Sequence, residues 1–411
     1  MSFPVAVLLA VFTLIALRRT GRLRLRIWQV MAGGALAVLA SGDIAPMDAL
    51  AVIDLDVMAF LFGMFVLGEA LLASGALYAF AYRWLWRARS TDALVVALLV
   101  GAGVGSALLM NDTLAIVGTP LALRLAQEHR IDPRVLLLAL AFAVTTGSVP
   151  SPIGNPQNLL IAVDGAFVNP FASFLAQLGP PTLFALAACY GVLRLVHWRE
   201  FHRTPLEHAQ VRIKDTALAR LAGSGVGIVV ALILAKSLLI ALGIPWGLRL
   251  SAIALAGALP ILLASPRRGQ ILRRLDWQTL AFFAAMFVLM ESVWRTGAFQ
   301  ALFRDLGVDL AAPTSVLGVG VLLSQLISNV PLVALYLPLL EQAGAGEAAR
   351  LALAAGSTIA GNLLILGAAS NVIIAESAER RGVHLSFLDF ARAGVPLTLA
   401  QVAIYWLFLP P

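Results

Sequence analysis

Charged residues are scarce in this 411-residue chain, where Asp, Glu, Lys and Arg together make up 12% of the positions. A soluble protein of ordinary composition carries about twice that fraction. Hydrophobic residues instead account for 60%, and apolar runs of transmembrane length recur along the whole chain. The composition therefore excludes a soluble globular fold and predicts an all-α polytopic membrane protein.

Cysteine and histidine are also rare, with one cysteine and five histidines. The single Cys189 excludes both a disulfide framework and a thiolate metal cluster. All five histidines fall in polar connecting segments, so no histidine-based metal site is expected within the membrane. The chain carries no Gly-x-Ser-x-Gly, His-Glu-x-x-His or nucleotide-binding motif, which argues against an intramembrane enzyme and against an ATP-driven pump in one chain.

The apolar runs predict a set of membrane-crossing helices at 3–17, 27–46, 57–73, 135–163, 173–196, 222–243, 247–264, 277–294, 347–375 and 390–409. Two further apolar regions, 92–128 and 312–341, are interrupted near the middle by polar or proline-containing tripeptides and are predicted to be helical hairpins. We expect about 10–11 spans in total. A re-entrant hairpin and a pair of full crossings both return the chain to the side from which it entered. The charge distribution is therefore compatible with both arrangements.

Basic residues predict the orientation, because short cytoplasmic loops retain Lys and Arg. Most of them lie in the segments 18–26, 83–89, 124–134, 194–220, 267–274 and 380–392. If each hairpin enters and leaves on the same side, all these segments share one face. We therefore expect a multi-pass protein of the cell (inner) membrane with both termini outside. Topology also explains the net charge of +7, so no nucleic-acid partner is expected.

An internal repeat is visible when residues 54–76 are aligned with 276–298, which share Asp54/Asp276, Gly75/Gly297 and several apolar positions between them. The two copies start on opposite faces, so the repeats are inverted, as in many secondary transporters. The predicted organisation is N-terminal helices at 1–46, repeat 1 at 47–196, a cytoplasmic connecting loop at 197–221, and a second half at 222–409 that contains repeat 2 at 276–409. Each repeat holds one hairpin (92–128, 312–341) and one broken helix (135–163, 347–375).

The interruptions place amides, hydroxyls, glycine and proline inside apolar stretches, at 110–113, 150–158, 328–331 and 367–371. Non-helical backbone at membrane depth persists only where protein buries it or where it lines a wet cavity. Helix N-termini freed at such breaks attract anions, whereas freed carbonyls and amide oxygens bind cations. The alternative reading is that Gly, Ser and Asn only promote close helix packing. The pairing of the breaks by the repeat favours a binding site.

These motifs resemble those of the ion transporter superfamily, which includes arsenite permeases, citrate transporters, sodium/proton antiporters and divalent-anion:sodium symporters. The similarity lies in Asn111-Asp112-Thr113 with Thr119-Pro120, in Ser151 to Asn158, in Ser328-Asn329-Val330-Pro331 and in Gly367 to Asn371. The Gly-Asn-Pro-Gln-Asn string is similar to a prokaryotic anion-permease branch. The resemblance implies two inverted repeats, each with a re-entrant hairpin and a broken helix, in a homodimer that works by elevator-like movement.

The resemblance implies substrate and ion binding at the hairpin tips and the helix breaks. Met110 and Val330 depart from the Ser-Asn-Thr tip motif of the dicarboxylate branch, and Asp112 moves the match toward arsenite permeases. The candidate binding residues are Asn111, Asp112, Thr113, Gly154, Asn155, Asn158, Ser328, Asn329, Gly367, Ser370 and Asn371, with Na⁺ as the only expected cofactor, at Asn111, Asp112, Asn155, Asn329 and Asn371.

Asp112 is the candidate coupling residue, because an ionisable group near the bilayer midplane is costly and is retained for function. It can ligate Na⁺ or carry a proton; alternatively it only caps the second helix of its hairpin. The sequence thus predicts a non-enzymatic secondary transporter that moves a small anion, an inorganic oxyanion such as an arsenite-type species or a carboxylate, with Na⁺ or H⁺. The alternatives are a sodium/proton antiporter of the same fold and a passive channel.

Overall fold

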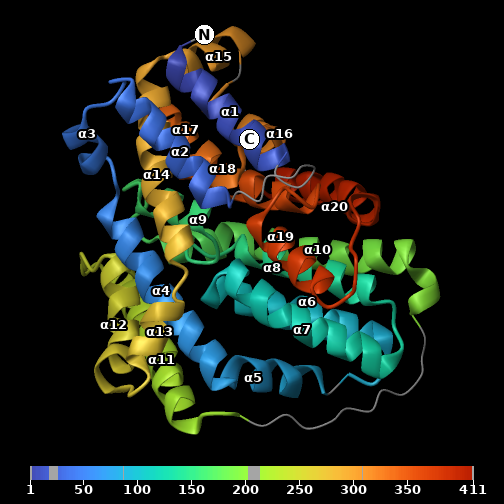
Figure 1. The fold of residues 1–411 in the computed structure, drawn as a ribbon. Helices are drawn as coiled ribbons and strands as arrows, with labels where there is room; N and C mark the ends of the chain where they lie inside the picture. The colour runs from blue at the N-terminus through green and yellow to red at the C-terminus, as the bar shows by residue number, and fades with distance from the viewer. Residues whose placement is uncertain (1, 18–25, 87, 202–212, 308, 410–411) are drawn as a thin grey trace.

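The computed structural model describes residues 2–17, 26–86, 88–201, 213–307 and 309–409, and within these ranges all regular structure is helical (Figure 1). The basic segment expected at 18–26 lies almost wholly outside the described residues, as does the middle of the connecting loop at 197–221. Within these described ranges, six helices are long and apolar enough to cross a membrane, and shorter apolar helices accompany them. The expected all-α polytopic architecture is therefore present.

The two repeats contain the same series of helices in the same order. In repeat 1 these are α4 (Leu55–Ser74), α5 (Ala76–Leu85), α6 (Thr91–Leu109), α7 (Asn111–His129), α8 (Pro133–Ser148), α9 (Pro156–Val163) and α10 (Pro170–Val196). In repeat 2 they are α14 (Trp277–Arg295), α15 (Ala298–Leu306), α16 (Pro313–Ile327), α17 (Asn329–Gln342), α18 (Glu347–Ile359), the 3-10 turn η2 (Ala360–Asn362), α19 (Ala369–Glu379) and α20 (Phe387–Phe408).

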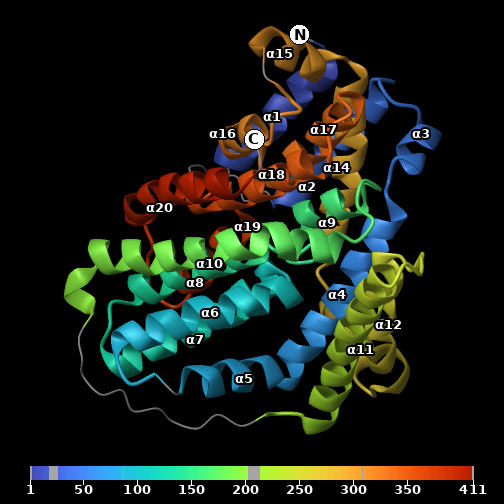
Figure 2. The same ribbon diagram turned by 180° about the vertical axis from the view of Figure 1, so that it is seen from behind.

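The remaining helices precede each repeat: α1 (Phe3–Leu17), α2 (Ile27–Ala40) and α3 (Pro46–Ala51) before the first, and η1 (Trp198–Glu200), α11 (Thr216–Ala241), α12 (Leu250–Ala264) and α13 (Arg268–Arg274) before the second. The short helices α3, α5, α13 and α15 were not expected, because they are too short to be recognised as spans. Figures 1 and 2 show α6, α7, α8, α10 and α20 as one stack beside a second group that contains α4, α11, α12 and α13.

The residues that reveal the repeat have equivalent structural roles in both copies. Asp54 and Asp276 cap α4 and α14, each accepting a hydrogen bond at 3.0 Å from a backbone N–H three residues later. Gly75 and Gly297 follow these helices with φ of 74° and 72°, a left-handed conformation that favours glycine. The identities found by alignment therefore mark where the first helix of each repeat begins and ends.

The helices that precede each repeat pack against the other repeat, α2 on α14 and α12 on α4. A Cβ added at Gly34 of α2 would lie 3.2 Å from Leu289, and one at Gly257 of α12 would lie 3.1 Å from Leu67. Leu67 and Leu289 are themselves equivalent positions in the repeat. The pseudosymmetry therefore includes the helices before each repeat, and small residues let these helices approach closely.

The loops of the protein separate onto two faces. On one face, Arg194 at the end of α10 pairs with Asp92 at the start of α6 at 3.2 Å, and Arg134 at the start of α8 lies 3.9 Å from Asp389 at the start of α20. Together with the segments joined by the Arg267–Asp215 pair at 3.2 Å, these loops carry most of the described basic residues, and we call this side the arginine-rich face. It corresponds to the side that the sequence predicts to be cytoplasmic.

The opposite face is held by a different set of ion pairs. Arg249 before α12 pairs with Asp56 at the start of α4 at 2.8 Å. Arg350 in α18 donates from its Nε to Asp164 at 2.6 Å and also hydrogen-bonds the Ala345 carbonyl, and this pair is the more deeply buried. Burial raises the pKa of the Asp164 carboxyl, and the Arg350 guanidinium beside it opposes that rise. Arg350 therefore joins the second broken helix to the end of the first.

The hairpin of repeat 1 enters and leaves at the arginine-rich face, and its tip stops inside the protein. The Asn111 N–H at the tip donates to the Gly154 carbonyl at 2.9 Å, within the break between α8 and α9. The tip therefore reaches the depth at which the spanning helix is interrupted, so the hairpin is re-entrant. The hairpin α16–α17 has the same construction from the opposite face, which makes the two repeats inverted.

Candidate functional site

Both hairpin tips share an unusual backbone conformation. Met110 has φ 68° and ψ 141°, and Ser328 has φ 70° and ψ 154°. Among the described non-glycine residues, Arg130 alone shares their positive φ. This conformation costs an L-amino acid free energy and concentrates at functional sites. It reverses the chain within one residue, so that α7 and α17 begin directly at the tips with Asn111 and Asn329.

The breaks in the spanning helices are braced by one asparagine in each repeat. The Asn158 amide donates to the carbonyls of Ser148, Val149 and Ser151 at 3.0–3.1 Å. Its repeat equivalent, Asn371, donates to the Gly361 carbonyl at 2.6 Å. These bonds give carbonyls at the helix interruption a side-chain donor, in addition to the long backbone bonds of 3.3 Å that the Ser148 and Ser151 carbonyls accept. Both asparagines therefore stabilise the non-helical backbone of the breaks.

Asn155 stabilises the start of α9. Its Oδ1 accepts the Asn158 N–H at 2.8 Å, which is an N-cap interaction, and its Nδ2 donates to Ser148 Oγ at 2.9 Å. Gly154 beside it has no room for a side chain, because a Cβ there would lie 2.6 Å from the Ser148 carbonyl oxygen. At the equivalent Gly367 a Cβ would lie 2.8 Å from the Ala360 carbonyl oxygen.

Thr358 in α18 connects the two breaks and was not predicted from the sequence. Its hydroxyl donates to Asn158 Oδ1 at 3.2 Å and accepts from Asn155 Nδ2 at 3.3 Å and from Gln157 Nε2 at 3.4 Å. Thr145 occupies the equivalent position in α8, and its buried hydroxyl has no partner. Matching these two threonines through the repeat is the signal that would have identified them.

A second buried polar cluster, also missed, lies beside the second break. Asn362 Nδ2 donates to Thr146 Oγ1 at 3.0 Å and to Gln401 Oε1 at 2.9 Å, and Gln401 Nε2 donates to Thr146 at 2.9 Å. All three side chains are fully buried or nearly so. The cluster ties α8, η2 and α20 together, so it orients the walls of the site.

Four of the predicted residues keep a buried oxygen without a hydrogen-bond partner: Asn111 Oδ1, Asn329 Oδ1, Ser370 Oγ and Asn371 Oδ1. For Asn371 the bond from Nδ2 to Gly361 identifies which end of the amide is the free oxygen. Buried polar atoms in native proteins are almost always paired, so unpaired ones call for a bound ion, water or ligand. Both tips and the second break thus offer free acceptors.

Free donors lie at the same places. The helices α7, α17 and α19 begin at the tips and at the second break, and none of them has a side-chain cap. At the start of α7 the Asn111 N–H already donates to the Gly154 carbonyl. Uncapped helix N-termini present N–H groups and a positive dipole end, which favour negative charge. The site therefore combines donors for an anion with oxygens for a cation.

Asp112 lies in the first turn of α7 and is only partly buried. Its carboxylate makes no hydrogen bond or ion pair that the described residues show, and α7 has no side-chain cap. The alternative reading of Asp112 as a simple helix cap therefore finds no support in the geometry. The next residue, Thr113, packs on α4, where a Cβ on Gly68 would lie 3.1 Å from its hydroxyl.

The structure thus joins the tip of the α6–α7 hairpin (tip 1) to the break between α8 and α9 (break 1) through Asn111 and Gly154. Thr358 joins break 1 to the opposite repeat. The hydrogen bonds of the described residues do not connect Asn111 with Asn329. Helix pairs α7–α19 and α9–α17 bring each tip helix against the short helix of the other repeat.

We expect Gly154→Ala to distort the first break, since the new methyl group overlaps the Ser148 carbonyl. Overpacking of this kind costs about 1–3 kcal/mol. The matched control is Gly223→Ala in α11, where a Cβ meets nothing within 4 Å. Thermal unfolding in detergent measures both variants: a lower melting temperature for Gly154→Ala beside an unchanged or higher one for Gly223→Ala is expected, and equal values would contradict the packing argument.

Comparison with known proteins places these features in a family context. The family described as "Citrate transporter" matches residues 8–353 of the chain. An uncharacterized transporter of Mycobacterium tuberculosis is 28% identical over 432 residues, covering 98% of this chain and 97% of that protein. The silicon efflux transporter LSI3 of rice, Oryza sativa subsp. japonica, is 28% identical over 448 residues and 90% of each chain is covered.

A solved structure shows a similar fold. The crystal structure of the YdaH transporter from Alcanivorax borkumensis, which is described as having an unusual topology, superimposes with a TM-score of 0.57. The match covers 91% of this chain and 87% of that one at 18% sequence identity. At this level of identity the similarity concerns the fold alone.

Proposed function

The chain belongs to the citrate transporter family and is a multi-pass membrane transporter, and we propose that it works as a secondary active transporter for a small anion, coupled to Na⁺ or H⁺. The proposed substrate is an inorganic oxyanion, such as an arsenite-type species, or a carboxylate. The observation that carries the proposal is the combination of helix N-termini without side-chain caps and amide oxygens without hydrogen-bond partners at the two tips and the second break. This pairing suits an anion and a cation bound together.

The proposed roles follow from the free atoms. Asn111, Thr113, Ser328 and Asn329 at the tips and Gly367, Ser370 and Asn371 at the second break line the substrate and ion site, with Gly154, Asn155 and Asn158 shaping the first break. We assign Na⁺ to oxygens of Asn111, Asp112, Asn329 and Asn371, with Asn155 as a bracing residue next to them. Asp112 is the proposed coupling group, since a carboxylate serves either Na⁺ or H⁺.

We further propose that the protein works as a homodimer in the inner membrane, with the arginine-rich face toward the cytoplasm. Alternating access then moves the hairpins and broken helices against the group that contains α4 and α12. The second candidate is a sodium/proton antiporter of the same fold, which the free oxygens and Asp112 alone would satisfy.

A ligand screen by thermal shift tests the proposal, because a ligand that binds only the folded protein adds about 2.7 kcal/mol of stability at one hundred times its Kd. The purified protein is heated with carboxylates, with oxyanions and with silicic acid, each with and without Na⁺. Silicic acid is included because the rice relative is a silicon efflux transporter. Stabilisation by one anion, followed by its gradient-driven uptake into proteoliposomes, is the expected result. Stabilisation by Na⁺ alone would favour the antiporter.

A further inference from the structure

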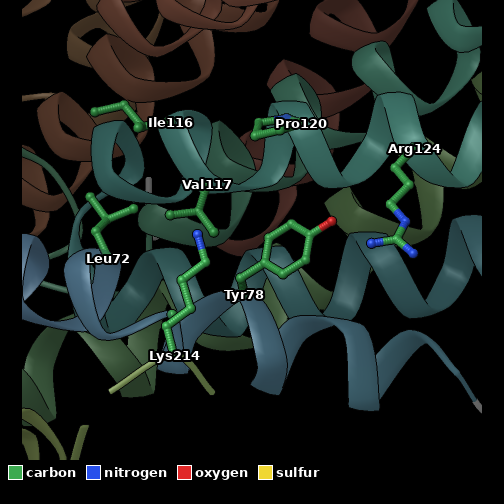
Figure 3. Close-up of a pocket in the computed structure, with 8 residues that line it drawn as sticks. Leu72, Tyr78, Ile116, Val117, Pro120, Arg124 and Lys214 are labelled. Carbon is green, nitrogen blue, oxygen red and sulfur yellow. The ribbon is translucent and has the colours of Figure 1, made fainter. Parts of the chain in front are cut away.

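A cavity of about 420 Å³ opens at the arginine-rich face, away from the tips and the breaks. It lies between the α4–α5 junction and α7, and the segment that leads into α11 forms its floor (Figure 3). Its lining residues are Leu72, Gly75, Tyr78, Ile116, Val117, Pro120, Arg124 and Lys214. The cavity therefore lies between the α6–α7 hairpin (hairpin 1) and α4, the first helix of repeat 1.

Two cationic groups and a phenol line the cavity, with Lys214 and Arg124 on either side of Tyr78. Figure 3 shows the Lys214 ammonium pointing toward Val117 and the Tyr78 hydroxyl pointing toward Arg124. The described residues provide no ion pair for Lys214, and the adjacent Asp215 pairs with Arg267 instead. Arg124 uses its Nε on Glu128 at 2.7 Å, and a guanidinium has further N–H groups to offer. The cavity therefore holds one ammonium group without an ion pair among the described residues, at Lys214, and further guanidinium donors at Arg124.

The rest of the cavity is apolar. Leu72 of α4 and Val117 and Pro120 of α7 form its walls, and Ile116 at its edge is 45% exposed in a helix that lies within the membrane. A small solute such as phosphate would leave these walls uncovered. An acyl chain would cover these walls favourably, because removing apolar surface from water lowers the free energy.

The charge is specific to this repeat. At the positions equivalent to Tyr78 and Arg124, the second repeat has Gln300 and Gln342. The cationic lining of the cavity is therefore not repeated in the second half of the chain. It occurs where α7 meets the arginine-rich face, at the level where phosphate headgroups lie if this face is cytoplasmic.

We propose that this cavity binds an anionic phospholipid, with its phosphate between Lys214, Tyr78 and Arg124 and an acyl chain along Leu72, Ile116 and Val117. Basic pockets between transmembrane helices at the cytoplasmic side recognise such headgroups. The lipid bridges α7 to the α4–α5 junction, so its occupancy stabilises hairpin 1 in the arrangement seen here. The proposal does not depend on which solute the protein transports.

The test is a titration of the detergent-purified full chain with phosphatidylglycerol or phosphatidylcholine, followed by melting temperature and by native mass spectrometry of retained lipid. Phosphatidylglycerol is expected to raise the melting temperature and remain bound, and phosphatidylcholine is expected to do neither. Lys214→Gln should weaken the phosphatidylglycerol response about fivefold, since a basic residue near a membrane surface contributes about that factor. Lys214→Gln combined with Arg124→Gln should remove it, and Lys214→Arg should keep it.

Arg273→Gln is the matched control, because Arg273 lies on α13 outside the cavity lining, and it should leave the response unchanged. Lys214 is exposed, so its substitution leaves the packed core intact. Equal phosphatidylglycerol responses in the wild type and the double variant would overturn the proposal. So would full stabilisation by inorganic phosphate without lipid, which would identify a soluble anion as the ligand.

Discussion

Asp112→Asn is expected to uncouple transport from its driving ion. The substitution keeps the size of the side chain but removes the one carboxylate at hairpin tip 1, where the described residues offer it no counter-ion. Interactions with a charged group are worth about 1.5–3 kcal/mol. The apparent affinity for the coupling ion should therefore fall by about 10- to 150-fold. Substrate uptake into proteoliposomes, measured with and without Na⁺ and H⁺ gradients, checks this result.

Asp305→Asn serves as the matched control, since Asp305 is an exposed carboxylate on α15. It should retain the full gradient dependence of the wild type. Residual downhill exchange by Asp112→Asn would show that the variant is folded and still binds substrate. Uptake by Asp112→Asn that responds to both gradients as the wild type does would remove Asp112 from the coupling mechanism.

Arg350→Met is expected to cause the largest loss of stability among single substitutions on the opposite face. Arg350 and Asp164 are 7% and 15% exposed, and the substitution leaves the Asp164 carboxylate buried without its partner. Removing one member of a buried ion pair costs about 3–5 kcal/mol. Thermal unfolding in detergent, followed by tryptophan fluorescence, measures the effect.

The exposed pair Arg249–Asp56, with side chains 75% and 38% exposed, provides the matched comparison. Arg249→Met should cost at most about 1 kcal/mol, because water already solvates both charges. The double variant Arg350→Met with Asp164→Leu should recover much of the loss, since an apolar pair needs no compensation in a dry site. Similar melting temperatures for Arg350→Met and Arg249→Met would show that burial does not control the energy of these pairs.

The inverted repeat was predictable because its strongest identities mark helix termini. Asp54 and Asp276 are N-caps, and Gly75 and Gly297 need positive φ, so each position tolerates few residue types. The amphipathic helices α5 and α15 were not predicted, although they are also repeat equivalents. Their apolar positions are too few to form a run of membrane length, so hydropathy alone does not identify these helices.

The candidate site was predicted in outline, because asparagine, serine and glycine are conspicuous in an apolar stretch. Asn111 and Asn371 do present free oxygens, but Asn155, chosen on the same grounds, has its oxygen bonded to the Asn158 N–H. Thr358 was not predicted, because threonine is common in membrane helices and its partners lie about half the chain length away in the sequence. Its bond with Asn155 joins residues 203 positions apart.

The sequence by itself determined that the chain lies in lipid, that its basic loops share one face, and that two inverted halves are each interrupted twice. These properties follow from composition, from the positions of the charged residues and from the internal repeat, all of which are features of the linear sequence. The tertiary structure alone decided that hairpin 1 is re-entrant, which amides brace the breaks and which remain free. Those outcomes depend on hydrogen-bond partners from the other repeat, and pairing across such distances is set by packing in space.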